Sequence, residues 1–248
     1  MMIAARVPAA LAPHRRARPS LMPLFALALC ALAAPAAHAD DDVAAPPLVQ
    51  ANPPAPLGDH WGVVSATTDA PGHDVLSVEF GFPAVSFGYT HGMTDSTDWG
   101  VRVDMLYGVL YTTNTQFGMA ARLPLRKVLA RNGKMNFLVH IDPGIFTYAG
   151  SETTESLFGI LVPVGAAVGF QPIPDLRVSF GVDLPLAVQF LHSADFFIGP
   201  QFGFTAETFV DKSVSVGINL RFGPMFVPTQ SSDAQLGFVA QATLGYRL

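Results

Sequence analysis

His140 and Asp142 could do chemistry together, because they are an ionisable pair separated by a single residue. In an extended chain they lie on one face, where such a pair can bind a metal ion or exchange protons. Two protein ligands are too few for a metal site, however, and polar pairs also fill the interior of β-proteins. Interior polar packing is therefore the simpler interpretation of this pair, and a small reactive site is the alternative.

His192, Ser193 and Asp195 form a second group, which contains the residue types of a base, a nucleophile and an orienting carboxylate. An activated serine of this kind would make the protein a hydrolase. Residues adjacent in sequence rarely face one another as a triad requires, and a short polar loop explains the same residues. We therefore predict no catalytic residue and no enzymatic activity.

The N-terminus has the pattern of a secretory signal peptide. Four arginines precede residue 20, an apolar run covers residues 21–34, and Ala-His-Ala at 37–39 has the small-x-small pattern of a cleavage site. The run is shorter than the roughly 18 apolar residues that indicate a membrane-spanning helix. We predict that residues 1–39 are removed on export, and with them Cys30, so the mature chain has no thiol and no disulfide.

Loss of this leader leaves an acidic protein. The chain has 14 Lys and Arg against 19 Asp and Glu, and four arginines but no acid precede Asp40. The mature chain therefore has ten basic and nineteen acidic residues, a formal charge of about −9, which argues against nucleic acid as a partner. Residues 40–58 are acidic and proline-rich without periodicity, so we expect an extended lead-in to a folded domain at 59–248.

From residue 98 to the last residue, apolar and polar side chains alternate. The stretch 176–190 shows this best, with apolar residues at even positions and polar residues at most odd positions. A period of two is that of a β-strand between two unlike environments. Eight such stretches are clear and are separated by turn-rich clusters: 98–111, 116–123, 134–148, 158–170, 176–190, 198–210, 214–226 and 235–248.

Residues 75–91 are harder to interpret, because their apolar phase shifts by one position near Pro83. One extra residue at Pro83 would give a single bulged strand, whereas a turn at Phe82-Pro83 would give two strands. We predict the bulged strand, because residues 69–74 carry the stronger turn signal and leave 61–68 as a weak first strand. Either interpretation gives ten strands.

The composition indicates where such strands would lie. Only 13% of residues are charged and the mean hydropathy is +0.36. The polar columns contain mostly glycine, serine and isolated charges, whereas the outer face of a water-soluble sandwich is rich in charge. Strands in hydrocarbon must satisfy their backbone groups by closing the sheet. We predict an all-β fold, a closed antiparallel transmembrane β-barrel of about ten strands, with eight or twelve as alternatives.

In such a barrel both chain ends and alternate turns share one side of the membrane. The turns expected on that side are near 94–97, 126–133, 172–175 and 211–213. Aromatic residues near the strand ends would form girdles at the two membrane interfaces. These residues are Trp99, Phe170 and Tyr246 on one side and Phe158, Phe190 and Phe226 on the other.

The polar columns would line the lumen, either as a neutralising network of charges or as a polarised path for a solute. The polar candidates are Arg102, Asp104, Arg122, His140, Asp142, Asp183, Glu207 and Arg221. If the first two clear strands pair about a loop near residue 113, facing residues sum to about 226, so Asp104 lies opposite Arg122 within ion-pair reach. Lumen glycines would leave room for a pore or only permit strand curvature: Gly100, Gly118, Gly159, Gly165, Gly169, Gly181, Gly203, Gly217 and Gly237.

The chain ends on Leu244-x-Tyr246-x-Leu248 at the end of an alternating strand. With the leader and the strand pattern, this end resembles the C-terminal assembly signal of Gram-negative outer-membrane β-barrel proteins. The resemblance implies export through the periplasm, recognition by the barrel assembly machinery and insertion into outer-membrane lipid. Family members usually end on Phe or Trp, where this chain has Leu.

These observations predict a small integral outer-membrane protein, either structural or a narrow, porin-like passive channel for small solutes. No cofactor and no metal are expected. The alternative is an outer-membrane hydrolase that acts on lipid or peptide at the outer rim, with the loop at 192–195 as its site.

Overall fold

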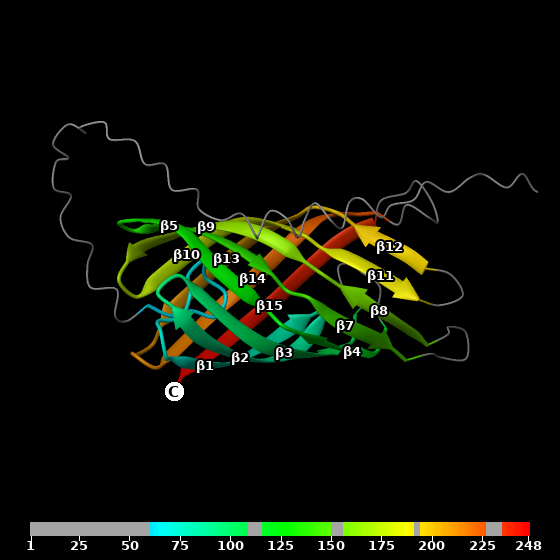
Figure 1. The fold of residues 1–248 in the computed structure, drawn as a ribbon, viewed down its shortest axis with the longest axis horizontal. Helices are drawn as coiled ribbons and strands as arrows, with labels where there is room; N and C mark the ends of the chain where they lie inside the picture. Colours follow the sequence, from blue (N-terminus) through cyan, green and yellow to red (C-terminus); the bar gives the residue numbers. More distant parts are fainter. Residues whose placement is uncertain (1–59, 109–115, 150–155, 191–193, 227–234) are drawn as a thin grey trace, which may run out of the picture. The chain divides into compact units, whose positions relative to one another are not determined.

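The computed structural model describes residues 60–108, 116–149, 156–190, 194–226 and 235–248. These residues form β-strands joined by turns (Figure 1). Across these ranges no helix is long and apolar enough to cross a membrane. The predicted all-β class is confirmed.

The strands run antiparallel in one sheet. Their bounds are β1 Asp74–Phe82, β2 Ala84–Thr94, β3 Thr97–Leu106, β4 Gly118–Arg122, β5 Leu125–Asn132, β6 Met135–Ile141, β7 Gly144–Tyr148, β8 Leu157–Leu161, β9 Val164–Ile173, β10 Leu176–Leu184, β11 Leu186–Phe190, β12 Ala194–Ile198, β13 Gln201–Phe209, β14 Val214–Met225 and β15 Gln235–Arg247.

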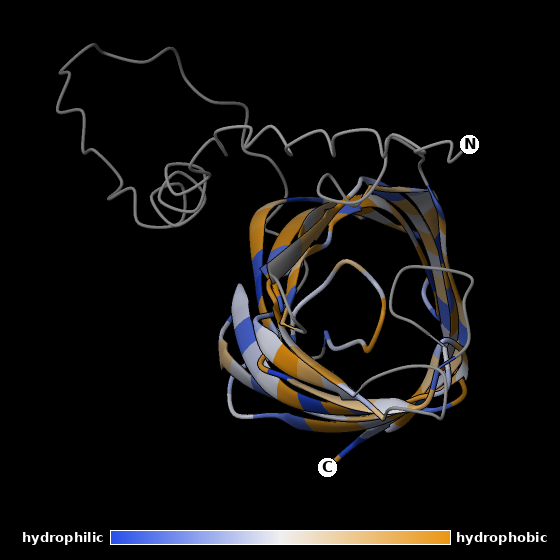
Figure 2. Ribbon diagram, turned by 90° about the vertical axis from the view of Figure 1, so that its right-hand side faces the viewer, coloured by the Kyte–Doolittle hydropathy of each residue, from blue (hydrophilic) through white to orange (hydrophobic). Residues whose placement is uncertain are grey.

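The sheet closes because β1 pairs with β15, from Val75 opposite Arg247 to Phe82 opposite Ala240. Five of the long strands are interrupted once, so that each consists of two short segments that follow one another along the wall. These pairs of segments are β4 with β5, β6 with β7, β8 with β9, β10 with β11, and β12 with β13. Counted as continuous strands, these give the predicted closed antiparallel barrel of ten strands. Figure 2 looks into the ring that these strands form.

Proline explains the five interruptions. Pro124, Pro143, Pro163, Pro185 and Pro200 each lie between the two segments of an interrupted strand. Proline has no N–H to donate to the ladder, so regular pairing ends there. The breaks are neighbours across the sheet, because Leu123 N donates to Pro143 O at 2.8 Å and Asp142 N donates to Pro163 O at 2.9 Å. A line of breaks thus separates β4, β7, β8, β11 and β12 from the rest of the barrel.

The rim beside Leu248 is here named the C-terminal rim, and the opposite one the far rim. The turns β2–β3, β5–β6, β9–β10 and β13–β14 all lie at the C-terminal rim, which is the grouping of turns that the sequence predicted. One of them is displaced along the chain. Most of the predicted turn at 126–133 belongs to β5, and the turn itself lies at Gly133 and Lys134, where Gly133 has a φ of 57°.

The prediction of one bulged strand over 75–91 is wrong. Residues 74–94 form the hairpin of β1 and β2, in which Gly81 pairs with Ala84 around Phe82 and Pro83. A two-residue turn puts the residues that flank it on the same face, so the outward positions change from even to odd numbers. This change of parity is the phase shift that a bulge would also produce.

The prediction of a weak first strand at 61–68 is also wrong. Residues 60–70 have no regular secondary structure and lie inside the barrel (Figure 2). Residues 65–70 are all buried, Thr68 and Asp69 with no exposed surface. We name residues 60–70 the plug. β1 rather than the plug therefore supplies the partner of β15.

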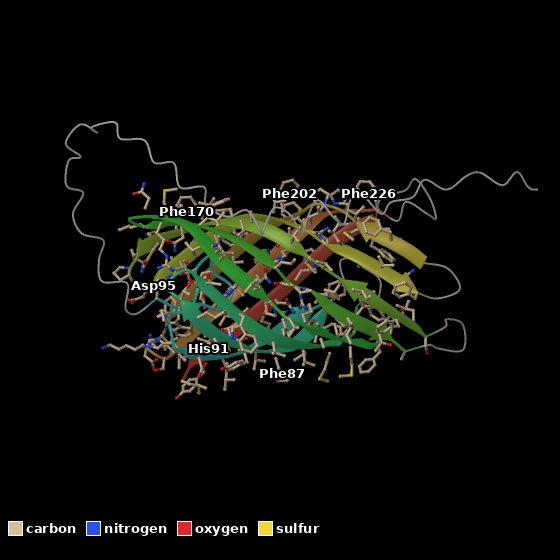
Figure 3. All side chains as sticks on the ribbon, viewed as in Figure 1. Phe87, His91, Asp95, Phe170, Phe202 and Phe226 are labelled. Atoms are coloured by element: carbon tan, nitrogen blue, oxygen red, sulfur yellow. The ribbon has the colours of Figure 1, made fainter. Side chains whose placement is uncertain are left out.

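The two faces of the barrel wall differ as the alternation predicts. Large apolar side chains lie on the outer face, such as Phe80 with 55% and Phe222 with 57% of its surface exposed. Phe87, Phe170, Phe202 and Phe226 project from this face in Figure 3. The residues expected at the interfaces are also exposed: Trp99, Phe158, Phe170, Phe190, Phe226 and Tyr246. Leu244 and Leu248, from the Leu-x-Tyr-x-Leu pattern at the C-terminus, lie on the outer face as well.

Candidate functional site in the barrel lumen

Two clusters of charged side chains cross the middle of the lumen, and we name them together the charge belt. In the first cluster Asp104 is fully buried, and its carboxylate accepts hydrogen bonds from both neighbouring arginines. Arg122 Nε donates to its Oδ2 at 2.8 Å, and Arg102 Nε donates to its Oδ1 at 2.8 Å. Arg102 also binds Glu79 and donates to Ser86 Oγ at 2.8 Å. Two carboxylates and two arginines balance in this cluster.

The predicted ion pair of Asp104 and Arg122 is confirmed, but through a register two residues away from the expected one. Arg102 pairs directly with Arg122, and Asp104 pairs with Ala120, so facing residues sum to 224. Two arginines directly opposite one another would repel. Asp104, diagonal to Arg122, compensates for this repulsion by accepting hydrogen bonds from both guanidinium groups.

The second cluster joins three strands around Asp183. Arg221 Nη1 lies 2.7 Å and His140 Nε2 lies 2.5 Å from the Asp183 carboxylate. His140 Nδ1 lies 3.9 Å from Asp142, too far for a hydrogen bond. The sequence pair His140 and Asp142 is thus part of a charge network in which His140 binds the more distant Asp183. Among the described residues, no group of His, Cys, Asp and Glu could hold a metal ion.

Glu207 lies on the plug side of the belt and binds the plug through hydrogen bonds. Its carboxylate accepts hydrogen bonds from Val63 N at 2.9 Å, Ser65 N at 3.2 Å and Ser65 Oγ at 2.7 Å. On the barrel side it accepts one from Ser215 Oγ at 2.7 Å. Glu207 has no exposed surface, so these contacts replace its hydration. One carboxylate of the barrel wall thus accepts hydrogen bonds from backbone N–H groups of the plug, which has no regular secondary structure.

Arg126 makes the second attachment of the plug. It donates to Asp98 Oδ1 at 2.8 Å and Oδ2 at 2.7 Å, and to the plug carbonyl of Gly62 at 3.0 Å. Asp98 in turn accepts a hydrogen bond from Asp69 N at 2.8 Å. Burial inside the lumen raises the pKa of the Asp69 carboxyl, and the nearby Arg126 opposes this effect.

The lumen glycines make room for neighbouring side chains and for the plug. A Cβ on Gly165 would lie 2.1 Å from His140 Nε2, and one on Gly169 would lie 3.0 Å from Ala66 Cβ of the plug. A Cβ on Gly159 would strike the Phe146 ring at 2.2 Å. Neither a pore nor strand curvature is needed to explain these three glycines, because their space is occupied.

Apolar side chains fill the lumen beyond the belt, toward the far rim. We name the following cluster the apolar layer: Ala84, Leu106, Ala120, Phe146, Tyr148, Leu161 and Ala187. Leu106 and Leu161 have no exposed surface. Most of these residues belong to β4, β7, β8 and β11, the segments beyond the line of proline breaks. The lumen therefore has three levels, which are the plug, the charge belt and the apolar layer.

A cavity of about 130 Å³ lies between the plug and the charge belt. Its walls include Ser65 and Ala66 of the plug, Glu79 and Thr205 of the strands, and Asp142 in the break between β6 and β7. A smaller cavity of about 60 Å³ lies against Asp104, Arg122 and Val239.

The other sequence candidates are placed as follows. His192 and Ser193 lie outside the described residues, and only the backbone of Asp195 is described, within β12. The remaining lumen candidates all belong to the belt or to the plug attachment. The sequence interpretation did not identify Glu79, Asp98, Arg126 or the plug itself. The glycines at lumen positions could have indicated the plug, because a glycine has no side chain and leaves space that another segment can fill.

No protein-family model matches the chain, and no curated protein matches it significantly.

Proposed function

We propose that this chain is a small, non-enzymatic integral outer-membrane β-barrel with a structural role, and that its lumen is closed. The observation that supports membrane insertion is the inverted distribution of polarity. Phe, Leu, Val and Met side chains cover the outside, whereas the ion pairs of Arg102, Arg122, Arg126 and Arg221 lie inside the closed sheet. Lipid surrounds such a surface favourably, and a water-soluble protein rarely exposes an apolar area of this extent.

In this proposal the C-terminal rim faces the periplasm and the far rim faces the outside. The partners are outer-membrane lipid and the barrel assembly machinery, which would recognise Leu244, Tyr246 and Leu248 on the outward face.

The filled lumen favours the structural role over the passive channel. An ion that entered from either rim would meet the plug, the buried belt and the apolar layer in turn. Removing an ion from water without new ligands costs several kcal/mol, and Asp69 of the plug, Asp104 of the belt and Leu161 of the apolar layer have no exposed surface. A channel would require at least the plug and the apolar layer to move.

Cell fractionation and bilayer recordings test the proposal. The mature protein is expected in the outer-membrane fraction, with a different gel mobility when it is not boiled. Recovery as a soluble periplasmic protein would contradict the location. The refolded protein is expected to give no conductance steps in planar bilayers, and regular steps would instead establish the narrow channel.

A further inference from the structure

We propose that the cavity between the plug and the charge belt is a binding site for a small organic cation with a primary ammonium group, and that the plug is its lid. This inference concerns the lumen alone and does not depend on the location of the barrel. It rests on three features of the cavity: its unpartnered polar atoms, its charge and its size.

The unpartnered atoms that face this cavity are mainly acceptors. Glu79 Oε2, Asp142 Oδ1 and Thr205 Oγ1 are buried and lack a hydrogen-bond partner, and all three residues line the cavity. Glu79 is only 4% exposed and Thr205 only 8%. Buried polar atoms are normally hydrogen-bonded, so unmatched carboxylate oxygens require a donor. An ammonium group has three donors and no acceptor, so it can donate to a carboxylate oxygen or a hydroxyl of this kind.

Carboxylates and arginines both line the cavity, and the lining residue Arg126 is already paired with Asp98. Arg102 and Arg122 neutralise Glu79 and Asp104 in the first cluster. In the second cluster Arg221 and His140 contact Asp183, whereas Asp142 has only His140 at 3.9 Å and no arginine among the described residues. Asp142 is therefore the carboxylate of the cavity wall that lacks an arginine partner among the described residues, and a bound cation would balance its charge.

The size of the cavity limits the ligand. A cavity of about 150 Å³ can hold benzene, so about 130 Å³ accommodates a molecule of up to roughly six non-hydrogen atoms. A bare metal ion would lack ligands, because no suitable group of three is present among the described side chains. A short aliphatic ammonium fits both the volume and the acceptors.

The plug controls access to the site. Ser65 and Ala66 form one wall of the cavity, and Glu207 binds the backbone at Val63 and Ser65. On the other side, the belt and the apolar layer separate the cavity from the far rim. A solute from the C-terminal rim would enter only when these plug contacts open.

Calorimetric titration of the detergent-solubilised mature protein with ethylammonium tests the site. Saturable binding is expected, and ethanol, which is similar in size but neutral, is expected to bind at least tenfold more weakly. Asp142→Asn should weaken ethylammonium binding at least tenfold and Thr205→Val about threefold, because each removes one acceptor. Asp175→Asn, in the exposed turn before β10, is the charge-matched control and should bind as the parent protein does.

Two results would overturn the proposal. Absence of saturable binding, or equal binding of ethanol, would show that water alone occupies the cavity. An unchanged affinity in a folded Asp142→Asn variant would place binding elsewhere.

A second measurement needs no variant of the site. Ethylammonium should raise the unfolding temperature of the parent protein, whereas tetraethylammonium, too large for the cavity, should not at equal ionic strength. Equal shifts would contradict a site of this size.

The role of the plug as the lid is tested separately. Glu207→Gln should increase the association rate of ethylammonium several-fold, and an unchanged rate would exclude the plug as the lid.

Discussion

The lumen near the C-terminal rim and the lumen near the far rim are filled in different ways. Near the C-terminal rim a separate segment enters the barrel and is held by directional hydrogen bonds to Glu207, Arg126 and Asp98. Toward the far rim the strands fill the space with their own apolar side chains. Directional contacts depend on single atoms, whereas apolar packing depends on volume, so the two halves should respond differently to substitution.

The largest loss of stability is expected from Asp104→Ala, between the two halves. The substitution leaves Arg102 and Arg122 buried without their shared carboxylate, which should lower the free energy of unfolding by about 4 kcal/mol. Chemical unfolding in detergent, with Asp175→Ala as control, measures this loss. The double variant Asp104→Arg with Arg122→Asp should recover part of it, and a double variant no better than the worse single one would contradict the pairing.

Leu161→Ala in the apolar layer should cost about 3 kcal/mol, because it leaves a cavity among side chains that cannot collapse fully. Leu161→Met keeps most of the volume and should cost less than about 1.5 kcal/mol. The same unfolding experiment compares the two. If they were equally destabilising, volume would not be what matters in this half of the lumen.

Glu207→Gln should weaken the plug by about 2 kcal/mol, because the carboxylate loses its charge and part of its acceptor capacity. The mature chain would contain no cysteine, so Thr67→Cys provides a single thiol in the plug, at a position that is 1% exposed. Its labelling rate should rise about 30-fold in the Glu207→Gln background. Asp175→Asn is the control, and equal labelling in both would show that Glu207 does not hold the plug.

The smallest effect is expected from Gly169→Ala, whose new Cβ would lie 3.0 Å from Ala66 Cβ. Such crowding should displace the plug at a cost of about 1 kcal/mol and raise Thr67→Cys labelling about fivefold. Gly203→Ala is the matched control, because the nearest atom to its Cβ lies at 3.7 Å. A similar rise with both alanines would mean that the glycines act through strand curvature and not through space for the plug.

The hairpin at residue 83 shows how far a local pattern can be interpreted. The shift of apolar phase was visible, but a bulge and a two-residue turn change the parity of outward positions in the same way. The choice depends on which segment pairs with β15, and that pairing joins the first strand of the chain to the last. No local pattern contains that information.

The pair of Asp104 and Arg122 shows a partial success of the same kind. Both faces and the sign of the interaction followed from alternation, but the register was displaced by two residues. A displacement of two preserves every face, so the hydrophobic pattern cannot detect it.

The sequence by itself determined the all-β class and which side chains of the eight clear strands face inward, because alternation with a period of two is written in consecutive residues. The total of ten strands agrees with the structure only because the missing strand at 61–68 is offset by the hairpin at 74–94. Only the tertiary structure decided that residues 60–70 enter the lumen, since their anchor Glu207 lies 144 residues from Val63. It also aligned the proline breaks of five strands into one line and brought His140 to Asp183. These features depend on which strands become neighbours when the sheet closes, and closure is a property of the whole barrel.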